Sequence, residues 1–133
     1  MRAQIDKFGR GALHYAAADG NTAEVSKLIR EGAAVDLPDR DGWTPLHFAA
    51  QTSSAASVRA LLEAGANFDA RDSHGNTPLF RAVFGSRGTG EIIGLLRGAG
   101  CDPLSQNNHG VSPLSLARSI GNYDVAQFFS DLP

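Results

Sequence analysis

The 133-residue chain has 42% apolar and 20% charged residues, which is typical of one globular domain rather than of a disordered segment. Its formal net charge of −2 disfavours general binding to nucleic acid or to an anionic membrane, because both require an excess of basic residues. A single cysteine, Cys101, excludes an internal disulfide and the usual cysteine-based zinc sites. We expect a cytoplasmic protein, since the sequence contains neither a signal-peptide core nor an apolar run of ~20 residues.

A glycine-centred motif recurs four times along the chain. In chain order the copies are "FGRGALHYAA" from residue 8, "DGWTPLHFAA" from 41, "HGNTPLFRAV" from 74 and "HGVSPLSLAR" from 109. Gly9, Gly42 and Gly75 follow one another at intervals of 33 residues, whereas Gly110 comes 35 residues after Gly75. A fixed interval in the range of roughly 20–50 residues is typical of a stacked solenoid. The sequence therefore predicts four repeats, the third with two extra residues.

Each motif predicts the start of a short helix. In three of the motifs a hydroxyl residue precedes a proline: Thr44, Thr77 and Ser112. Proline suits the first helical turn, and the preceding hydroxyl can cap it by accepting a backbone hydrogen bond. A segment rich in glycine and polar residues comes before each helix and predicts a turn at the tip of a hairpin-like loop.

A second helix is predicted later in each repeat. Val58, Leu61 and Leu62 have the i, i+3, i+4 spacing of one helical face. Gly65 then favours the end of that helix, because glycine tolerates the left-handed backbone conformation. In the last repeat we expect the second helix within "DVAQFFSDLP", residues 124–133. One such unit cannot bury its apolar face alone, so the four units must stack.

These motifs resemble the ankyrin repeat, a unit of 33 residues with a T-P-L-H-x-A core. The second repeat has the closest similarity, through Thr44, Pro45, Leu46, His47 and Ala49. The first repeat has Gly-Ala in place of Thr-Pro, and the third has phenylalanine in place of histidine. The resemblance implies an all-α solenoid of four helix-turn-helix units with hairpin-like loops. We expect one domain, residues 1–133, with repeats at approximately 6–38, 39–71, 72–106 and 107–133.

The histidines and aspartates that recur at fixed repeat positions favour structural roles. The resemblance implies that His14 and His47 tie neighbouring loops through ring hydrogen bonds. The recurrence of Asp6, Asp39 and Asp72 indicates a turn role rather than a pair of catalytic carboxylates. Ligand spacing such as H-x₃-H is absent from the sequence, and we expect no catalytic residue, no cofactor and no metal site.

The glycine-rich stretch "GSRGTGE", residues 85–91, has two interpretations. It lacks the lysine of a phosphate-binding loop, so the first is a helix-to-helix loop that carries the two extra residues. The second is a loop used for partner contact, because insertions in repeat proteins often lie on the binding face.

The residues outside the scaffold pattern predict a binding surface in the concave groove and at the loop tips. Tyrosine, tryptophan and arginine dominate protein–protein hot spots, and Trp43 is predicted at a loop tip near the middle of the array. The alternatives are that some rings pack between repeats and that the arginines pair with Asp19 and Asp41. The predicted contact residues are Phe8, Arg10, Tyr15, Arg40, Asp41, Trp43, Phe48, Gln51, His74, Asn76, Arg81, Phe84, Arg87 and His109.

The resemblance implies that the protein works by binding another protein, as a monomer when free. Residues 75–125 also resemble small single-domain bacterial ankyrin proteins, some of which are similar to immunity proteins made beside a toxin. This second resemblance implies a cytosolic inhibitor whose partner is a toxin domain. The alternative is a regulatory or scaffolding adaptor for an endogenous enzyme or transcription factor. An enzyme or small-molecule site in the groove is disfavoured, because the sequence contains no catalytic constellation.

Overall fold

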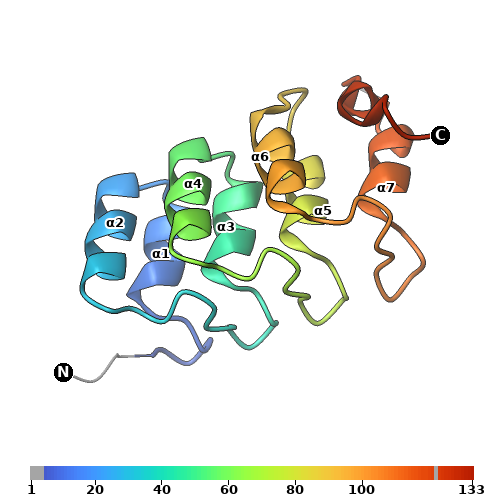
Figure 1. Ribbon diagram of the computed structural model, residues 1–133. Helices are drawn as coiled ribbons and strands as arrows, with labels where there is room; N and C mark the ends of the chain where they lie inside the picture. The colour runs from blue at the N-terminus through green and yellow to red at the C-terminus, as the bar shows by residue number, and fades with distance from the viewer. Residues whose placement is uncertain (1–4, 122) are drawn as a thin grey trace.

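The computed structural model describes residues 5–121 and 123–133, and these form helices and loops without a β-strand. Seven α-helices are followed by one 3₁₀ helix, as Figure 1 shows. The elements are α1 (Ala12–Ala18), α2 (Thr22–Arg30), α3 (Pro45–Gln51), α4 (Ala55–Glu63), α5 (Pro78–Gly85), α6 (Glu91–Ala99), α7 (Pro113–Ser119) and η1 (Val125–Phe129).

The helices stack in two rows. The first helices of the repeats, α1, α3, α5 and α7, pack against one another in chain order, and α2, α4 and α6 form the second row. Leu46, Leu61 and Leu79 lie fully buried between the rows. Because each repeat packs mainly against its neighbours, the apolar face of every unit is covered by the next one. The predicted all-α repeat solenoid is confirmed.

The predicted caps of the first helices are confirmed. The hydroxyl oxygens of Thr44, Thr77 and Ser112 accept hydrogen bonds from backbone N–H groups three residues later, at 3.4, 3.3 and 3.1 Å. Each cap is followed by proline at the start of its helix. These short helices therefore begin where the local sequence predicts, since the hydroxyl satisfies a donor that the helix itself leaves unpaired.

The last helix differs from the prediction. Residues 124–133 do not form a second α-helix, and only Val125–Phe129 are helical, in the tighter 3₁₀ conformation. This winding places Phe129 in the core, with 1% of its surface exposed. Arg97 of α6 donates hydrogen bonds to the backbone oxygen of Phe128 at 3.0 Å and to the Asp131 carboxylate at 2.7 and 2.8 Å. The segment is thus held by hydrogen bonds from Arg97 of α6 and by packing against α7, rather than by an α-helical ladder.

The two extra residues of the third repeat lie between α5 and α6. Residues 86–90 connect these helices, whereas residues 19–21 and 52–54 connect the corresponding helices of the first two repeats. The interpretation of the glycine-rich stretch as a lengthened helix-to-helix loop is confirmed.

The loop tips share one hydrogen-bond pattern. The Asp39 carboxylate accepts bonds from the backbone N–H groups of Asp41 and Trp43, at 2.9 and 2.8 Å, and the Asp39 N–H donates to the Trp43 carbonyl. Asp6 and Asp72 make the same contacts, which confirms their predicted turn role. In the fourth loop the Asn107 side-chain oxygen takes the place of the carboxylate.

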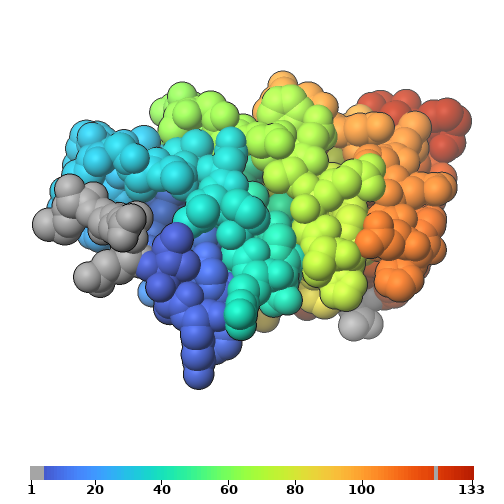
Figure 2. Space-filling view, turned by 90° about the horizontal axis from the view of Figure 1, so that it is seen from below, coloured from blue at the N-terminus to red at the C-terminus, as the bar shows by residue number. Residues whose placement is uncertain are grey.

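Neighbouring loops are joined through their backbones. The N–H groups of Arg40, Ser73 and Asn108 donate to carbonyl oxygens of the preceding loop, at 2.9, 2.8 and 2.9 Å. Figure 2 shows the loop segments as successive ridges, in blue, teal, yellow-green and orange, on one side of the molecule. Side chains carried by different tips are consequently held in a fixed order.

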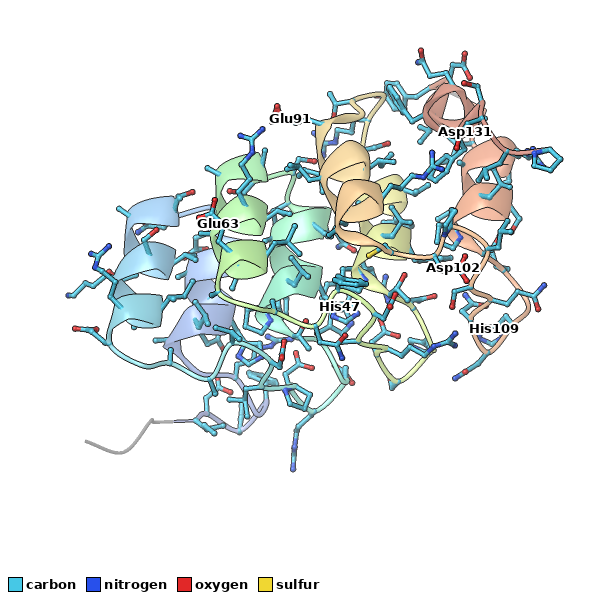
Figure 3. The ribbon with its side chains drawn as sticks, viewed as in Figure 1. His47, Glu63, Glu91, Asp102, His109 and Asp131 are labelled. Carbon is cyan, nitrogen blue, oxygen red and sulfur yellow. The ribbon has the colours of Figure 1, made fainter. Side chains whose placement is uncertain are left out.

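The two repeat histidines also join neighbouring loops. Nδ1 of His14 and of His47 accepts a bond from the N–H group of its own N-cap, and Nε2 donates to a carbonyl of the next loop, Trp43 at 3.1 Å or Asn76 at 2.9 Å. Figure 3 shows His47 in the interior, between α3 and the loops. Burial lowers the pKa of both imidazoles, although the backbone bonds oppose part of that shift. The predicted structural role of these histidines is confirmed.

Candidate functional site

The structure places the fourteen predicted contact residues at three levels of exposure. Eight are exposed: Phe8, Tyr15, Arg40, Asp41, His74, Phe84, Arg87 and His109. Five are half-buried: Arg10, Trp43, Phe48, Gln51 and Arg81. Asn76 alone is buried.

Asn76 is buried, whereas the sequence pattern predicted an exposed side chain at a loop tip. Only 6% of its surface is exposed. Its side-chain oxygen accepts a bond from the Asn107 amide at 2.8 Å, and its backbone carbonyl accepts from His47. Asn76 is therefore part of the connection between the third and fourth loops, and a partner would have to break that connection to reach it.

Four rings and two arginines lie in one continuous row across the first three repeats. We call this the aromatic row, and its members are Phe8, Arg10, Tyr15, Phe48, Trp43 and Arg81. The Arg10 guanidinium carbon is 5.2 Å from the Phe8 ring centroid and 5.3 Å from that of Phe48. The centroids of Phe48 and Trp43 are 4.8 Å apart, and the Arg81 guanidinium carbon is 4.3 Å from the Trp43 ring. Such spacings are those of cation–π and aromatic contacts.

The two arginines of the row pair with buried aspartates of the loops, not with Asp19 and Asp41 as the alternative interpretation expected. Arg10 Nε is 3.1 Å from the Asp39 carboxylate, and Arg81 is 2.8 Å from that of Asp72. Each of these aspartates uses its other oxygen for the loop turn. One carboxylate therefore fixes a loop and holds a cation against the rings.

The environment of Asp72 favours its ionised form. Burial alone would raise the pKa of this carboxyl, but hydrogen bonds from Arg81 and from the backbone N–H groups of Asn76 and His74 outweigh it and lower the pKa. The Arg81–Asp72 pair is consequently a charged, half-buried unit at neutral pH, and it keeps the guanidinium plane beside Trp43.

Trp43 is less accessible than its predicted loop-tip position implied. Its ring packs against His47 and Phe48 as well as against Arg81. Trp43 and Phe48 are thus half-buried by packing against their neighbours, as the alternative interpretation expected for some rings. Phe8 and Tyr15, in contrast, are 46% and 42% exposed. A pocket of about 270 Å³ opens beside the two central rings, lined by Arg10, Asp41, Trp43, Phe48, Gln51 and Thr52.

A second apolar feature lies further along the array, at the C-terminal end of α5. Phe84 is 62% exposed and stands between two pockets, of about 530 Å³ towards α3 and about 320 Å³ towards α7. Arg87 of the lengthened loop lines both pockets. The sequence pattern predicted Phe84 and Arg87 but missed Tyr123, which lines the smaller pocket. The sequence signal that could have identified Tyr123 was its aromatic side chain, two residues after the repeat glycine Gly121.

The exposed histidines of the last two loop tips lie close together. The ring centroids of His74 and His109 are 6.4 Å apart, and Figure 3 shows His109 on the loop that precedes α7. Among the residues that the structure describes, no group of three or more histidine, cysteine, aspartate or glutamate side chains could hold a metal ion.

Cys101, the single cysteine of the chain, is buried. Its Sγ donates to the Phe68 carbonyl at 3.0 Å, and 4% of the residue is exposed. Burial raises the pKa of the thiol to about 12. Because the thiolate is the reactive form, this environment suits packing rather than nucleophilic chemistry.

Comparison with protein-family models gives a match. A family model described as ankyrin repeats, three copies, matches residues 2–72, just over half of the chain. No curated protein matches the sequence. In the described residues, none of the helices combines the length and the apolar character needed to cross a membrane.

Proposed function

Because the chain belongs to the ankyrin-repeat family, whose repeats are protein–protein interaction modules, we propose that it binds a partner protein through the aromatic row and the exposed loop tips. The observation that carries the proposal is the row itself. Two exposed rings, Phe8 and Tyr15, continue into half-buried Phe48 and Trp43, and a contiguous apolar patch on a soluble domain marks an interaction site. Arginine and aromatic residues are also the types enriched in binding hot spots.

The scaffold lowers the entropic cost of binding at this surface. Arg10 and Arg81 are held by buried carboxylates, and the loop tips are joined by backbone hydrogen bonds. Side chains that are already fixed lose less conformational freedom when a partner docks. This rigidity favours the aromatic row over the more isolated exposed side chain of Leu104 as a contact surface.

Within this function we propose that the partner is a toxin domain and that the protein is its cytoplasmic inhibitor, monomeric when free. The support is the resemblance of residues 75–125 to small bacterial ankyrin proteins of the immunity type. Inhibition would be stoichiometric occlusion, because the expected mechanism needs no catalytic residue. An adaptor for an endogenous enzyme or transcription factor is the alternative.

Affinity purification from the native host distinguishes these two roles. The tagged protein is recovered under mild conditions, and co-purifying proteins are identified and quantified by mass spectrometry. One stoichiometric partner with a toxin-like enzymatic domain would support the inhibitor. Several host proteins in sub-stoichiometric amounts would support the adaptor and would count against the inhibitor.

Substitutions then test whether the aromatic row makes the contact. Trp43→Ala should weaken binding of the recovered partner by about 2 kcal/mol or more, measured by calorimetry. Since Trp43 also packs inside the row, its variant must first be shown to remain folded. Phe8→Ala removes a more exposed ring, and Leu104→Ala is the matched exposed apolar control. Unchanged affinity in both Trp43→Ala and Phe8→Ala would remove the row from the interface.

A further inference from the structure

The surface around Phe84 has features that the proposed binding at the aromatic row does not explain. We call it the Phe84 site and define it by six residues of the two pockets: Gln51, Ser53, Phe84, Arg87, Leu116 and Tyr123. Figure 1 shows α5 between α3 and α7, so three consecutive repeats meet here. The smaller pocket is lined mainly by apolar side chains, which include Val83, Leu116 and Ile120.

Two strained residues line the larger pocket. Ser53 and Arg87 have φ values of +61° and +50°, and they are the only non-glycine residues with positive φ in the described part of the chain. Both line the 530 Å³ pocket. Backbone strain of this kind costs about 1 kcal/mol or more per residue and is concentrated at functional sites.

The strain at Ser53 has a local explanation. Gly20 holds the equivalent position of the first repeat, with φ of +67°. Serine at this position provides a hydroxyl that donates to the Gly85 carbonyl at 3.1 Å, so it anchors the end of α5 beside the pocket. Arg87 has no corresponding bond among the described residues, and its exposed guanidinium lines both pockets.

We propose that the Phe84 site is the specificity pocket for a partner polypeptide segment in which an apolar residue stands beside an aspartate or glutamate. The apolar side chain enters the 320 Å³ pocket and packs on Phe84, and the carboxylate pairs with Arg87. This inference rests on the proposed protein-binding function and names the partner's chemistry. A single exposed arginine beside apolar side chains suits a protein carboxylate better than a nucleic acid, which would require a basic stripe.

The test is selection from a random dodecapeptide library displayed on phage, with the whole protein immobilised. Enriched peptides are resynthesised, and their affinities are measured for the wild type and for four variants. Phe84→Ala removes an exposed ring and Arg87→Glu reverses the charge. Leu104→Ala is the matched exposed apolar control, and Phe8→Ala reports binding at the aromatic row. Thermal unfolding of each variant confirms that it is folded.

The expected peptides contain an apolar residue beside an acidic one. Their affinity should fall at least tenfold for Phe84→Ala and for Arg87→Glu, and should change less than twofold for Leu104→Ala. A repeated selection on Arg87→Glu should enrich lysine or arginine at the acidic position, a result that a merely structural Arg87 would not produce.

Three results would overturn the inference. Peptides without an acidic residue, peptides that tolerate Phe84→Ala, or the absence of any enrichment would each contradict it. Peptides that lose affinity with Phe8→Ala alone would contradict the Phe84 site while supporting the aromatic row as a protein-binding surface. Failure of the inference is therefore distinguishable from failure of the proposed function, which depends on the partner recovered from the host.

Discussion

The guanidinium of Arg81 lies against the Trp43 ring, with its central carbon 4.3 Å from the ring centroid. The same guanidinium donates to the Asp72 carboxylate at 2.8 and 3.3 Å. The two residues come from neighbouring repeats, so the contact exists only once the repeats are stacked. Arg81 therefore connects the stability of the loop turn at Asp72 to the orientation of the Trp43 ring in the aromatic row.

Arg81→Gln should destabilise the protein by about 3 kcal/mol, because it leaves the Asp72 carboxylate buried without its cation. Urea unfolding of the variant and of the wild type measures the difference. Arg40→Gln, an exposed arginine of the preceding loop, is the control and should change the free energy of unfolding by less than about 0.5 kcal/mol. Equal stability of Arg81→Gln and the wild type would show that the pair is not coupled to the fold.

Stability should decrease as the pH falls from about 7 to about 5. Burial lowers the pKa of His14 and His47 below the ordinary value of 6.5. The unfolded chain therefore binds protons at a higher pH than the folded chain does, and the stabilisation present above pH 6.5 is lost as the pH falls towards the lowered values.

The measurement is the free energy of unfolding in urea across this pH range. A variant with both His14→Gln and His47→Gln should show a weaker pH dependence than the wild type, whatever its absolute stability. An unchanged slope in the double variant would mean that other groups cause the pH dependence.

Two glycines in neighbouring helices should respond to alanine in opposite ways. A Cβ atom at Gly85 would overlap the backbone carbonyl oxygen of Gln51, whereas one at Gly94 meets nothing within 4 Å. Gly85→Ala should cost about 2 kcal/mol, because backbone must move to relieve the overlap. Gly94→Ala should stabilise by about 0.5–1 kcal/mol through helix propensity. Thermal unfolding checks both, and a harmless Gly85→Ala would contradict the close approach of α3 and α5.

Shortening the loop between α5 and α6 should leave the solenoid intact. Deletion of Arg87 and Thr89 restores the three-residue connection of the first two repeats and keeps Gly88, whose φ of +91° resembles that of Gly20. Gly90 must also stay, because a side chain there would overlap the Phe128 ring. Far-UV circular dichroism should show unchanged helix content. A loss of helix would show that the two extra residues are needed for the fold itself.

Much of the fold could be predicted because its signals are local. The caps at Thr44, Thr77 and Ser112 and the turns at Asp39 and Asp72 use hydrogen bonds that span two to four residues. A pattern that repeats at a constant interval therefore predicts the same local geometry each time. The prediction was wrong for residues 124–133, where contacts with Arg97 and burial of Phe129 determine the conformation.

The candidate site was predicted less completely, because its geometry depends on stacking. Loop position alone predicted that Asn76 and Trp43 would be equally exposed. In the structure Asn76 is buried beside Asn107, and Trp43 is half-buried beside Phe48. Nothing in the local sequence indicated that Asp39 would bind Arg10, 29 residues away.

The sequence by itself determined the repeat, the starts of the capped first helices and the loop turns, since each depends on a short segment and its own backbone. The role of His14 and His47 came from the family resemblance, because their Nε2 bonds reach carbonyls 29 residues away. Only the tertiary structure decided the partners of Arg10 and Arg81, the continuity of the aromatic row and the pockets on either side of Phe84. Those features form where side chains of successive repeats meet, and their distances are set by helix packing across the array rather than by residue order.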